Sequence, residues 1–320
     1  MRADTALAPA MESPARLVWR RFCRHRLALA SLVLLVLLAG LALAAPLIER
    51  ALGLDATAVN LFGRLAPPSP QHWLGTDELG RDLMLRLLYG ARVSLFVGIV
   101  AALAAASIGS ILGVAAGYLG GRLDAVLMRL ADGGISLPML PLLIVLAAID
   151  PAKLGLPDSV AQSENLSLYR IVAIIALVGW TTTARLVRGA TLSLKERAFV
   201  EAARAQGATA ARIMFRHILP NAMSPILVAT TLSVGNVILL ESVLSFLGLG
   251  IQPPVASWGA MLTGAQETLW QRPALALYPG LLIFLTVIAF NFLGDGLQDA
   301  FDPRAGRGAG RGAGRCVVRG

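Results

Sequence analysis

Histidine and cysteine, the side chains most often used for nucleophilic catalysis and metal binding, are scarce in this 320-residue chain. The three histidines are His25, His72 and His217, and none lies at metal-ligand spacing from another His, Cys or carboxylate. The two cysteines, Cys23 and Cys316, lie in the two terminal segments and give no basis for a disulfide framework. The sequence therefore predicts no catalytic residue, no metal site and two free thiols.

The lysines argue against ATP hydrolysis by this chain. A phosphate-binding P-loop requires Gly-Lys-Ser or Gly-Lys-Thr, because its backbone amides and its lysine hold the phosphates. The only two lysines are Lys153 and Lys195, and neither follows a glycine. We therefore expect this chain to have no ATPase activity and to bind no cofactor.

The most informative polar segment is 185–219, which separates two apolar runs. It carries Glu201-Ala-Ala-Arg-Ala-Gln-Gly207 and, ten residues later, Ile218-Leu-Pro220-Asn221. Residues 195–206 are rich in helix formers, the glycine permits a sharp turn, and residues 211–219 can begin a second helix. The pattern predicts a short helical hairpin across one face of the membrane.

A hairpin of this kind suits docking to a partner protein. The small Ala202 and Ala203 would allow a close approach, and Arg204, Arg212 and Arg216 could meet acidic groups at the rim. The alternative is an ordinary solvated amphipathic loop, with which the composition agrees equally well.

The spacing in this segment resembles the cytoplasmic Glu-Ala-Ala loop of bacterial ABC importer permeases, where Glu-Ala-Ala, three residues and Gly precede a Leu-Pro at the next span. Further segments are similar to the dipeptide, oligopeptide and nickel permease family, and specifically to its C-type subunit. They are His72–Asp82, Leu244–Leu262 and Phe290–Pro303. The resemblance covers roughly residues 15–304, and it departs from the family in the C-terminal tail, the short 150–165 segment and Gly133-Gly134.

The resemblance implies one permease of a heterodimer, paired with a B-type permease, two cytoplasmic ABC ATPases and an extracytoplasmic solute-binding protein. The ATPases, not this chain, would bind ATP and Mg²⁺. Closure of the ATPases would be converted into alternating access by the loop residues. These are Glu201, Ala202, Ala203, Arg204, Gly207 and Pro220. Di- and oligopeptides are the expected substrates, and glutathione-like peptides, nickel chelates and other small solutes stay open.

Long apolar runs must position this loop. Hydrophobic residues make up 56% of the chain and charged residues only 15%, with a mean hydropathy of +0.70. About 20 helical residues cross the hydrocarbon core of a membrane. Six runs are nearly free of charge: 27–48, 93–119, 125–149, 171–184, 220–240 and 273–294. The fourth run is short and needs flanking residues to cross the membrane. The sequence predicts an all-α integral membrane protein with about six transmembrane helices.

The basic residues predict the orientation. If the N-terminus lies inside, 20 of the 28 Lys and Arg fall in cytoplasmic segments and eight in extracytoplasmic ones. The cytoplasmic segments are 1–26, 120–132, 185–219 and 295–320; the others are 49–92, 150–170 and 250–272. This bias obeys the positive-inside rule and predicts cytoplasmic termini in a multi-pass protein of the bacterial inner membrane. It also accounts for the net charge of +9 without nucleic acid, because no basic stretch interleaves with aromatic residues.

The domain organisation follows from these segments. Residues 1–26 form a basic cytoplasmic segment, 27–48 a retained anchor, and 49–92 an extracytoplasmic segment. A cleavable signal peptide is the alternative for the anchor, although its apolar run exceeds a typical h-region. Residues 93–294 form a core of five spans that includes the 185–219 loop, and 295–320 end in a disordered Gly/Arg tail.

Three sets of residues outside the loop are candidates for other roles. Asp77, Glu78, Arg81 and Asp82 could touch the binding protein or cap helix ends. Gly109, Gly113 and Gly117 recur every four residues, which predicts a ridge for close helix packing. Glu241 is expected at the outer interface, where its carboxylate would be solvated, and Arg129 could pair with Asp132.

Two other classes of membrane protein fit less well. A secondary transporter would carry ionisable residues deep in its spans, and the span interiors lack them. An intramembrane enzyme would need a nucleophile with a base or a metal pair within the bilayer, and all three histidines lie outside the spans.

Overall fold

The computed structural model describes residues 14–149 and 165–302. Helices and their connecting loops make up these residues, which form no β-sheet. The short 150–165 segment lies outside the described residues, except for residue 165. The Gly/Arg tail beyond residue 302, which includes Cys316, also lies outside them. Within the described parts the predicted all-α membrane fold is confirmed.

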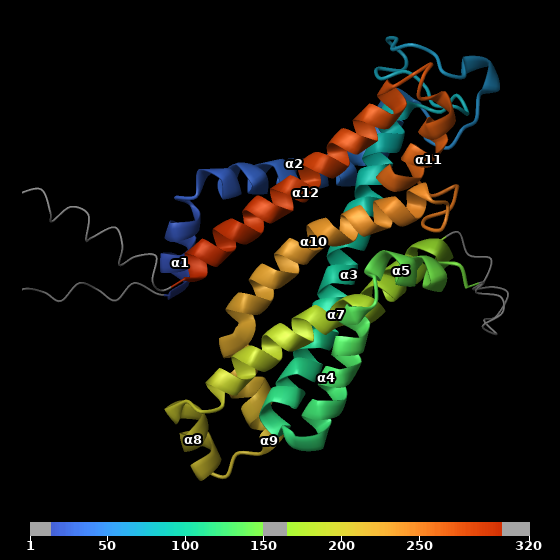
Figure 1. Ribbon diagram of the computed structural model, residues 1–320. Coiled ribbons are helices and arrows are strands. Elements are labelled where there is room, and N and C mark those ends of the chain that lie inside the picture. The colour runs from blue at the N-terminus through green and yellow to red at the C-terminus, as the bar shows by residue number, and fades with distance from the viewer. Residues whose placement is uncertain (1–13, 150–164, 303–320) are drawn as a thin grey trace, which may run out of the picture.

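Five helical segments are long and apolar enough to cross a membrane (Figure 1). Four are single helices: α2 (Arg26–Leu52), α3 (Leu83–Leu119), α7 (Leu166–Leu194) and α12 (Ala274–Phe301). The fifth is 210–246, which ends in α10 (Met223–Phe246). It starts with α9 (Ala210–Arg212), a π-helical turn (Ile213–Ile218) and a 3-10 turn (Leu219–Ala222). The 37 residues of α3 span about 55 Å, more than the hydrocarbon thickness.

The run expected as a straight third span, 125–149, is instead a bent pair of helices. α4 (Gly121–Ser136) and α5 (Met139–Ala147) meet at 92°. Pro138 lies at the break and Leu137 before it is extended, because a proline removes an amide donor and disfavours helical geometry in the residue before it. By length and apolar character, the described residues therefore contain five candidate spans, or six if this bent pair counts as one.

α3 is the central helix and contacts α2, α7 and α10. Its glycine ridge packs on α7 of the same chain. A Cβ atom on Gly109 would lie 2.6 Å from the Trp180 carbonyl oxygen, and one on Gly117 would lie 2.7 Å from the Thr191 Cβ. Such contacts bring the two backbones together, as small residues do in membrane helix pairs.

The remaining helices close the bundle at its two ends. α1 (Pro14–Phe22) packs on the end of α12, and α8 (Ala198–Ala205) with α9 projects from the same end of the molecule (Figure 1). The loop 53–82, with a 3-10 turn at Leu61–Gly63, and α11 (Trp258–Thr268) lie at the opposite end. α3 begins at Leu83, ten residues earlier than the hydropathy indicated, so its first turns belong to the loop end.

Candidate functional site

The hairpin between α7 and α10 contains the Glu-Ala-Ala segment. α8 ends at Ala205, and Gly207 follows with φ +77°, a conformation that costs glycine little and other residues much more. The amide of Ala208 donates to the Ala203 carbonyl at 3.1 Å, which closes the turn. The Thr209 side chain then caps the next helix by accepting from the Arg212 amide. The residues thus form the helical hairpin that their pattern predicts.

The inner face of the hairpin is apolar and packs on the spans. Val200, Ile213 and Ile218 are fully buried in one cluster with Val114 of α3 and Val187 of α7. Ala203 joins this cluster with 8% of its surface exposed, so it faces its own chain and not a partner. The inner face of the hairpin is therefore held by side chains of both α3 and α7.

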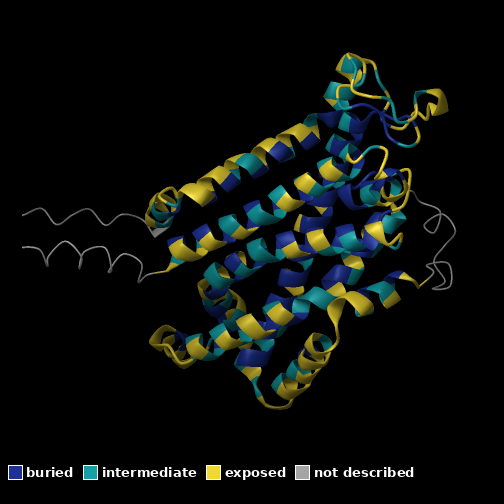
Figure 2. Ribbon diagram, turned by 45° about the horizontal axis from the view of Figure 1, so that its top comes forward, coloured by how far each residue is buried: buried dark blue, intermediate teal, exposed yellow. Residues whose placement is uncertain are grey.

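The outer face of the hairpin is exposed, and Figure 2 shows the exposed surface on this projection. Glu201, Ala202 and Gly207 are exposed, as are the aromatic rings of Phe199 and Phe215. Glu201 lies in the first turn of α8, where a carboxylate favours the helix dipole. The outer face therefore presents small, acidic and aromatic side chains to its surroundings, while the inner face is held by the spans.

Polar contacts tie the hairpin to the end of α3. The guanidinium of Arg204 lies over the ring of Tyr118, 5.9 Å from its centroid, which is a cation–π distance. Lys195 donates to the Gly117 carbonyl at 3.3 Å. Pro220 is exposed in the 3-10 turn that leads into α10. The hairpin therefore contacts α3 as well as α7 and α10, the two spans that it joins.

A bidentate ion pair fixes α4 beside the same end. Arg188 of α7 donates to both carboxylate oxygens of Asp124, at 2.5 and 2.7 Å. The pairing expected between Arg129 and Asp132 is wrong, because Asp132 lies 3.5 Å from Arg185 of α7 instead. Both acidic residues of α4 therefore pair with arginines of α7 and not with an arginine of α4.

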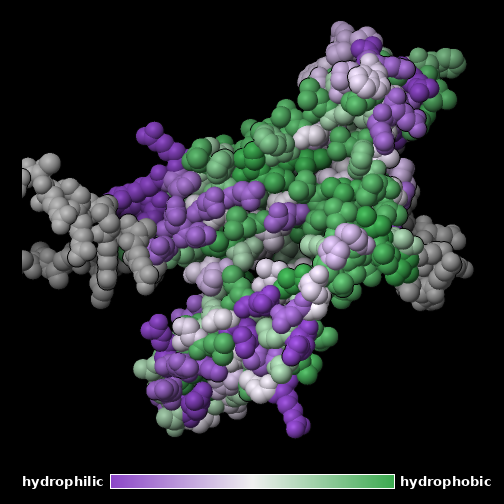
Figure 3. Space-filling view, in the orientation of Figure 1, coloured by the Kyte–Doolittle hydropathy of each residue, from purple (hydrophilic) through white to green (hydrophobic). Residues whose placement is uncertain are grey.

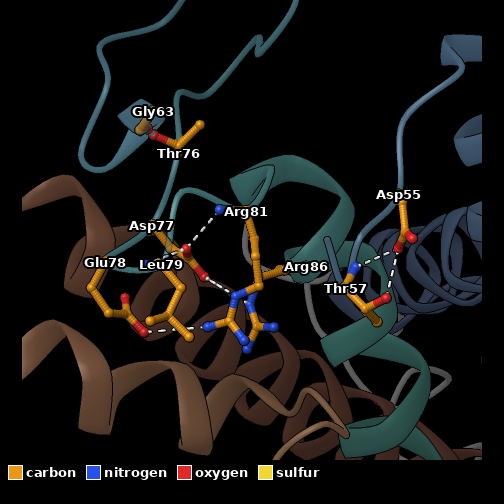
Figure 4. A network of polar contacts seen from close by, with 9 residues as sticks. All are labelled: Asp55, Thr57, Gly63, Thr76, Asp77, Glu78, Leu79, Arg81 and Arg86. Atoms are coloured by element: carbon orange, nitrogen blue, oxygen red, sulfur yellow. Dashed lines mark hydrogen bonds and ion pairs between the residues drawn. The ribbon is translucent and has the colours of Figure 1, made fainter. Parts of the chain in front are cut away.

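At the opposite end, a buried ionic network holds the loop 53–82 (Figure 4). The carboxylate of Asp77 accepts from Arg81 Nε at 2.7 Å and lies 3.2 Å from Arg86 Nε. It also accepts from the backbone amides of Leu79 and Arg81, both at 2.9 Å. Glu78 contacts the outer nitrogen of Arg81 at 3.4 Å. Four nitrogen atoms thus converge on one carboxylate, two from arginine side chains and two from the backbone, and the contact with Arg86 anchors the loop to α3.

Asp82, the last residue of this loop, caps α3. Asp82 accepts from the Leu85 amide at 2.8 Å and lies 2.9 Å from His72 Nδ1. Asp77, Arg81 and Asp82 are each less than 10% exposed, which leaves their side chains little surface for a partner, whereas Glu78 is partly exposed. Asp55, on the exposed side of the loop, accepts from the hydroxyl and amide of Thr57, and these bonds lower the pKa of Asp55.

Comparison with known proteins agrees with this arrangement. Residues 109–307 match the family of binding-protein-dependent transport system inner membrane components, which covers the bent pair, the hairpin and the last three spans. Residues 13–68 match the N-terminal transmembrane domain of oligopeptide transport permease C. The chain belongs to this family of inner-membrane permeases. The resemblance noted in the sequence is confirmed.

Relatives of this permease align along nearly its whole length. It is 39% identical to the oligopeptide transport system permease protein OppC of Bacillus subtilis, over 89% of this chain and 88% of that one. Identity to the dipeptide transport system permease protein DppC of the same organism is 41%, over 95% and 90%. The glutathione transport system permease protein GsiD of Pectobacterium atrosepticum is also 41% identical, over 92% of each chain.

One buried acid of the permease was not expected. Glu241 of α10 is fully buried, so the solvated interfacial position inferred from its depth is wrong. Its carboxylate accepts from Ser245 at 2.7 Å and from Ser94 of α3 at 3.3 Å. Each serine oxygen in turn accepts a hydrogen bond from a backbone amide. Ser245 accepts from Ile251 at 3.0 Å, and Ser94 accepts from Trp258 at 3.2 Å. The acid therefore secures both ends of the connection between α10 and α11, and α11 covers it.

Proposed function

We propose that this chain is the C-type permease of an ATP-driven importer of small peptides. It pairs with a B-type permease and two ABC ATPases, one of which docks on the outer face of the hairpin that contains Glu201 and Ala202. The proposal rests on the difference between the two faces of this hairpin. Its inner face is buried against two spans, and its outer face is exposed on a rigid turn.

The coupling mechanism follows from these contacts. When the ATPases close, they move α8, and Val200 and Ala203 pass the displacement to α3 and α7 because their side chains pack in a cluster shared with both spans. The Arg204–Tyr118 and Lys195–Gly117 contacts add a polar link to α3. The spans then rotate as packed bodies, which opens the pathway first to one side and then to the other. This chain performs no covalent chemistry, and the ATPases bind ATP and Mg²⁺.

The orientation is part of the same proposal. The hairpin and both termini face the cytoplasm, since the ATPases are cytoplasmic and since the basic residues concentrate at that end. The loop 53–82 then faces the extracytoplasmic solute-binding protein, and the partly exposed Glu78 is the member of the predicted acidic and basic set that remains able to contact it.

The substrates named for the relatives support small peptides as the substrate of this permease. The relatives named above are permeases of oligopeptide, dipeptide and glutathione systems, and glutathione is itself a small peptide. A nickel chelate stays the alternative cargo, and the experiment below includes it.

The test is peptide-stimulated ATP hydrolysis by the complete transporter in lipid nanodiscs, with uptake measured in proteoliposomes. Glu201→Ala and Ala202→Trp alter the docking face, and we expect both to lower stimulated hydrolysis and uptake at least about tenfold, as loss of an interface hot spot does. Glu196→Ala is the matched control, because Glu196 is exposed at the same end but precedes α8. Size-exclusion chromatography reports whether the permeases stay assembled.

Each result bears on one part of the proposal. Normal coupling in Ala202→Trp, with the ATPases still bound, would remove the docking role from this hairpin. Stimulation by a nickel chelate but by no di-, tri- or oligopeptide and not by glutathione would instead contradict the peptide substrate while leaving the docking role intact.

A further inference from the structure

The first helix lies across the end of the bundle and does not extend α2. The chain turns at Cys23–His25, so that α1 runs across the end of α2 and beside the end of α12 (Figure 1). Phe22 is buried against Ala28 and Ala300, which fixes α1 in this position. Trp19 stacks on Phe22 with ring centroids 5.9 Å apart, and yet 59% of its own surface is exposed. An exposed indole on a short amphipathic helix is typical of the headgroup level of a membrane.

Two apolar grooves open beside this helix. One, of about 730 Å³, is lined by side chains of α1, α2, α10 and α12, including Trp19, Phe22 and Leu297. The second, of about 490 Å³, lies between α7, α10 and the end of α12. They share Ser224 and Phe301 at their common rim. Two apolar grooves that meet at one rim have the arrangement that the two acyl chains of a single phospholipid require.

The rim of these grooves is basic. Five arginines lie within residues 16–26, which run from α1 through the turn to the start of α2: Arg16, Arg20, Arg21, Arg24 and Arg26. Arg21 donates to the Asp302 carbonyl at 3.0 Å, beside the groove residue Phe301, which places its guanidinium at the rim. The acids of this end are Asp295, Asp299 and Asp302, of which Asp299 lies 3.8 Å from His25. Positive charge is therefore in excess where the grooves reach the polar surface, and Figure 3 shows hydrophilic side chains gathered there beside apolar surface.

We propose that this site binds one anionic phospholipid, with its acyl chains in the two grooves and its phosphate among the arginines of residues 16–26. Basic residues on an interfacial helix attract anionic headgroups, with about fivefold in affinity for each arginine near the surface. A partner helix would fill apolar grooves equally well but would gain nothing from an arginine-rich rim. The charge therefore favours the lipid, and the site is independent of which solute the permease carries.

The experiment is photocrosslinking of lipid to the full-length chain in its assembled transporter. Nanodiscs of phosphatidylcholine receive a small fraction of phosphatidylglycerol with a photoreactive group in one acyl chain, or the phosphatidylcholine probe of equal chain length. Mass spectrometry then maps the adducts. We expect adducts of the anionic probe in 18–32 and 293–301 at several times the level of the neutral probe, and a decrease at high salt because screening weakens exposed charges.

Two variants and a control separate the headgroup contact from general folding. Arg16→Gln/Arg24→Gln/Arg26→Gln should reduce groove labelling by the anionic probe to the level of the neutral one. Ser224→Phe fills the common rim and should reduce labelling by both probes. Arg122→Gln/Arg129→Gln removes two exposed arginines of α4 and should leave labelling unchanged. Adducts elsewhere on the spans, at wild-type level, show that each variant is folded.

Equal groove labelling by the two probes would overturn the proposal, since the grooves would then hold only bulk lipid. Absence of lipid adducts from these grooves in the assembled transporter, with crosslinks from Trp19 to the partner permease, would overturn it as well and identify the partner as the occupant.

Discussion

Gly113 of α3 lies so close to Ala184 of α7 that a Cβ atom on the glycine would lie 2.5 Å from the Ala184 carbonyl oxygen. The obstructing atom belongs to the backbone, so it cannot move aside as a flexible side chain would. The Val187 Cβ would lie at 2.9 Å from the same added atom. The close packing of α3 on α7 at this position therefore depends on glycine, because any larger residue would need the two backbones to move apart.

We predict that Gly113→Ala destabilises the permease by about 1–3 kcal/mol, the usual cost of overpacking. Thermal unfolding of the purified protein in detergent measures this. Gly189→Ala is the matched control on α7, because no atom lies within 4 Å of its added Cβ. A Gly113→Ala melting temperature equal to that of Gly189→Ala would show that α3 and α7 can separate without cost.

The glycine ridge illustrates which features the sequence can predict. A four-residue spacing of small residues is a local property of one helix, and so are the turn at Gly207 and the apolar length of a span. The helix that receives the ridge is a property of the tertiary fold. The spacing could not distinguish α7 from a helix of a partner subunit, because small residues serve both contacts.

The errors have the same origin. The position of Glu241 along its span predicts its depth in the membrane, but it does not predict that the chain turns back at α11 and covers the carboxylate. The bend at Leu137-Pro138 carried a local signal, the proline itself, but hydropathy alone treated the run as one span. Arg86 joins Asp77 from the first turn of α3, which the hydropathy assigned to the loop.

The ionic network of the loop should be a strong determinant of stability. Asp77→Ala leaves Arg81 and Arg86 buried without their main acceptor, and removal of one partner from a buried pair costs about 3–5 kcal/mol. We expect residues 53–82 to become sensitive to protease while the spans stay intact. Asp55→Ala is the control, because Asp55 lies exposed in the same loop and bonds only to its neighbours in sequence. Protease resistance equal to wild type in Asp77→Ala would exclude this role.

The buried acid of α10 should control the connection that follows it. In Glu241→Ala the hydroxyls of Ser94 and Ser245 lose their shared acceptor, and a buried unsatisfied group costs about 1–3 kcal/mol. We predict amide hydrogen exchange in 247–258 to rise about tenfold, because the Ile251 and Trp258 amides depend on these serines.

Two further variants sharpen this prediction. Glu241→Gln keeps one carbonyl acceptor and should give an intermediate rate of exchange. Ser233→Ala removes a hydroxyl of the same helix that bonds only to the Thr230 carbonyl, and it should leave residues 247–258 unaffected. Unchanged exchange in Glu241→Ala would mean that packing by Trp258 alone secures the connection.

Arg188 of the Arg188–Asp124 pair lies in the last two turns of α7, near the hairpin, and we predict that the pair contributes to coupling. The bidentate geometry and partial burial should make it worth about 1–2 kcal/mol, above the usual surface pair. A double-mutant cycle of Arg188→Gln and Asp124→Asn, followed by thermal unfolding, measures that energy. If α4 must move with α7, the single variants will hydrolyse ATP normally but transport less peptide per ATP. Asp132→Asn is the matched control, since its pair with Arg185 is exposed and longer, at 3.5 Å. A transport ratio in Arg188→Gln that equals the ratio in Asp132→Asn would assign the pair to stability alone.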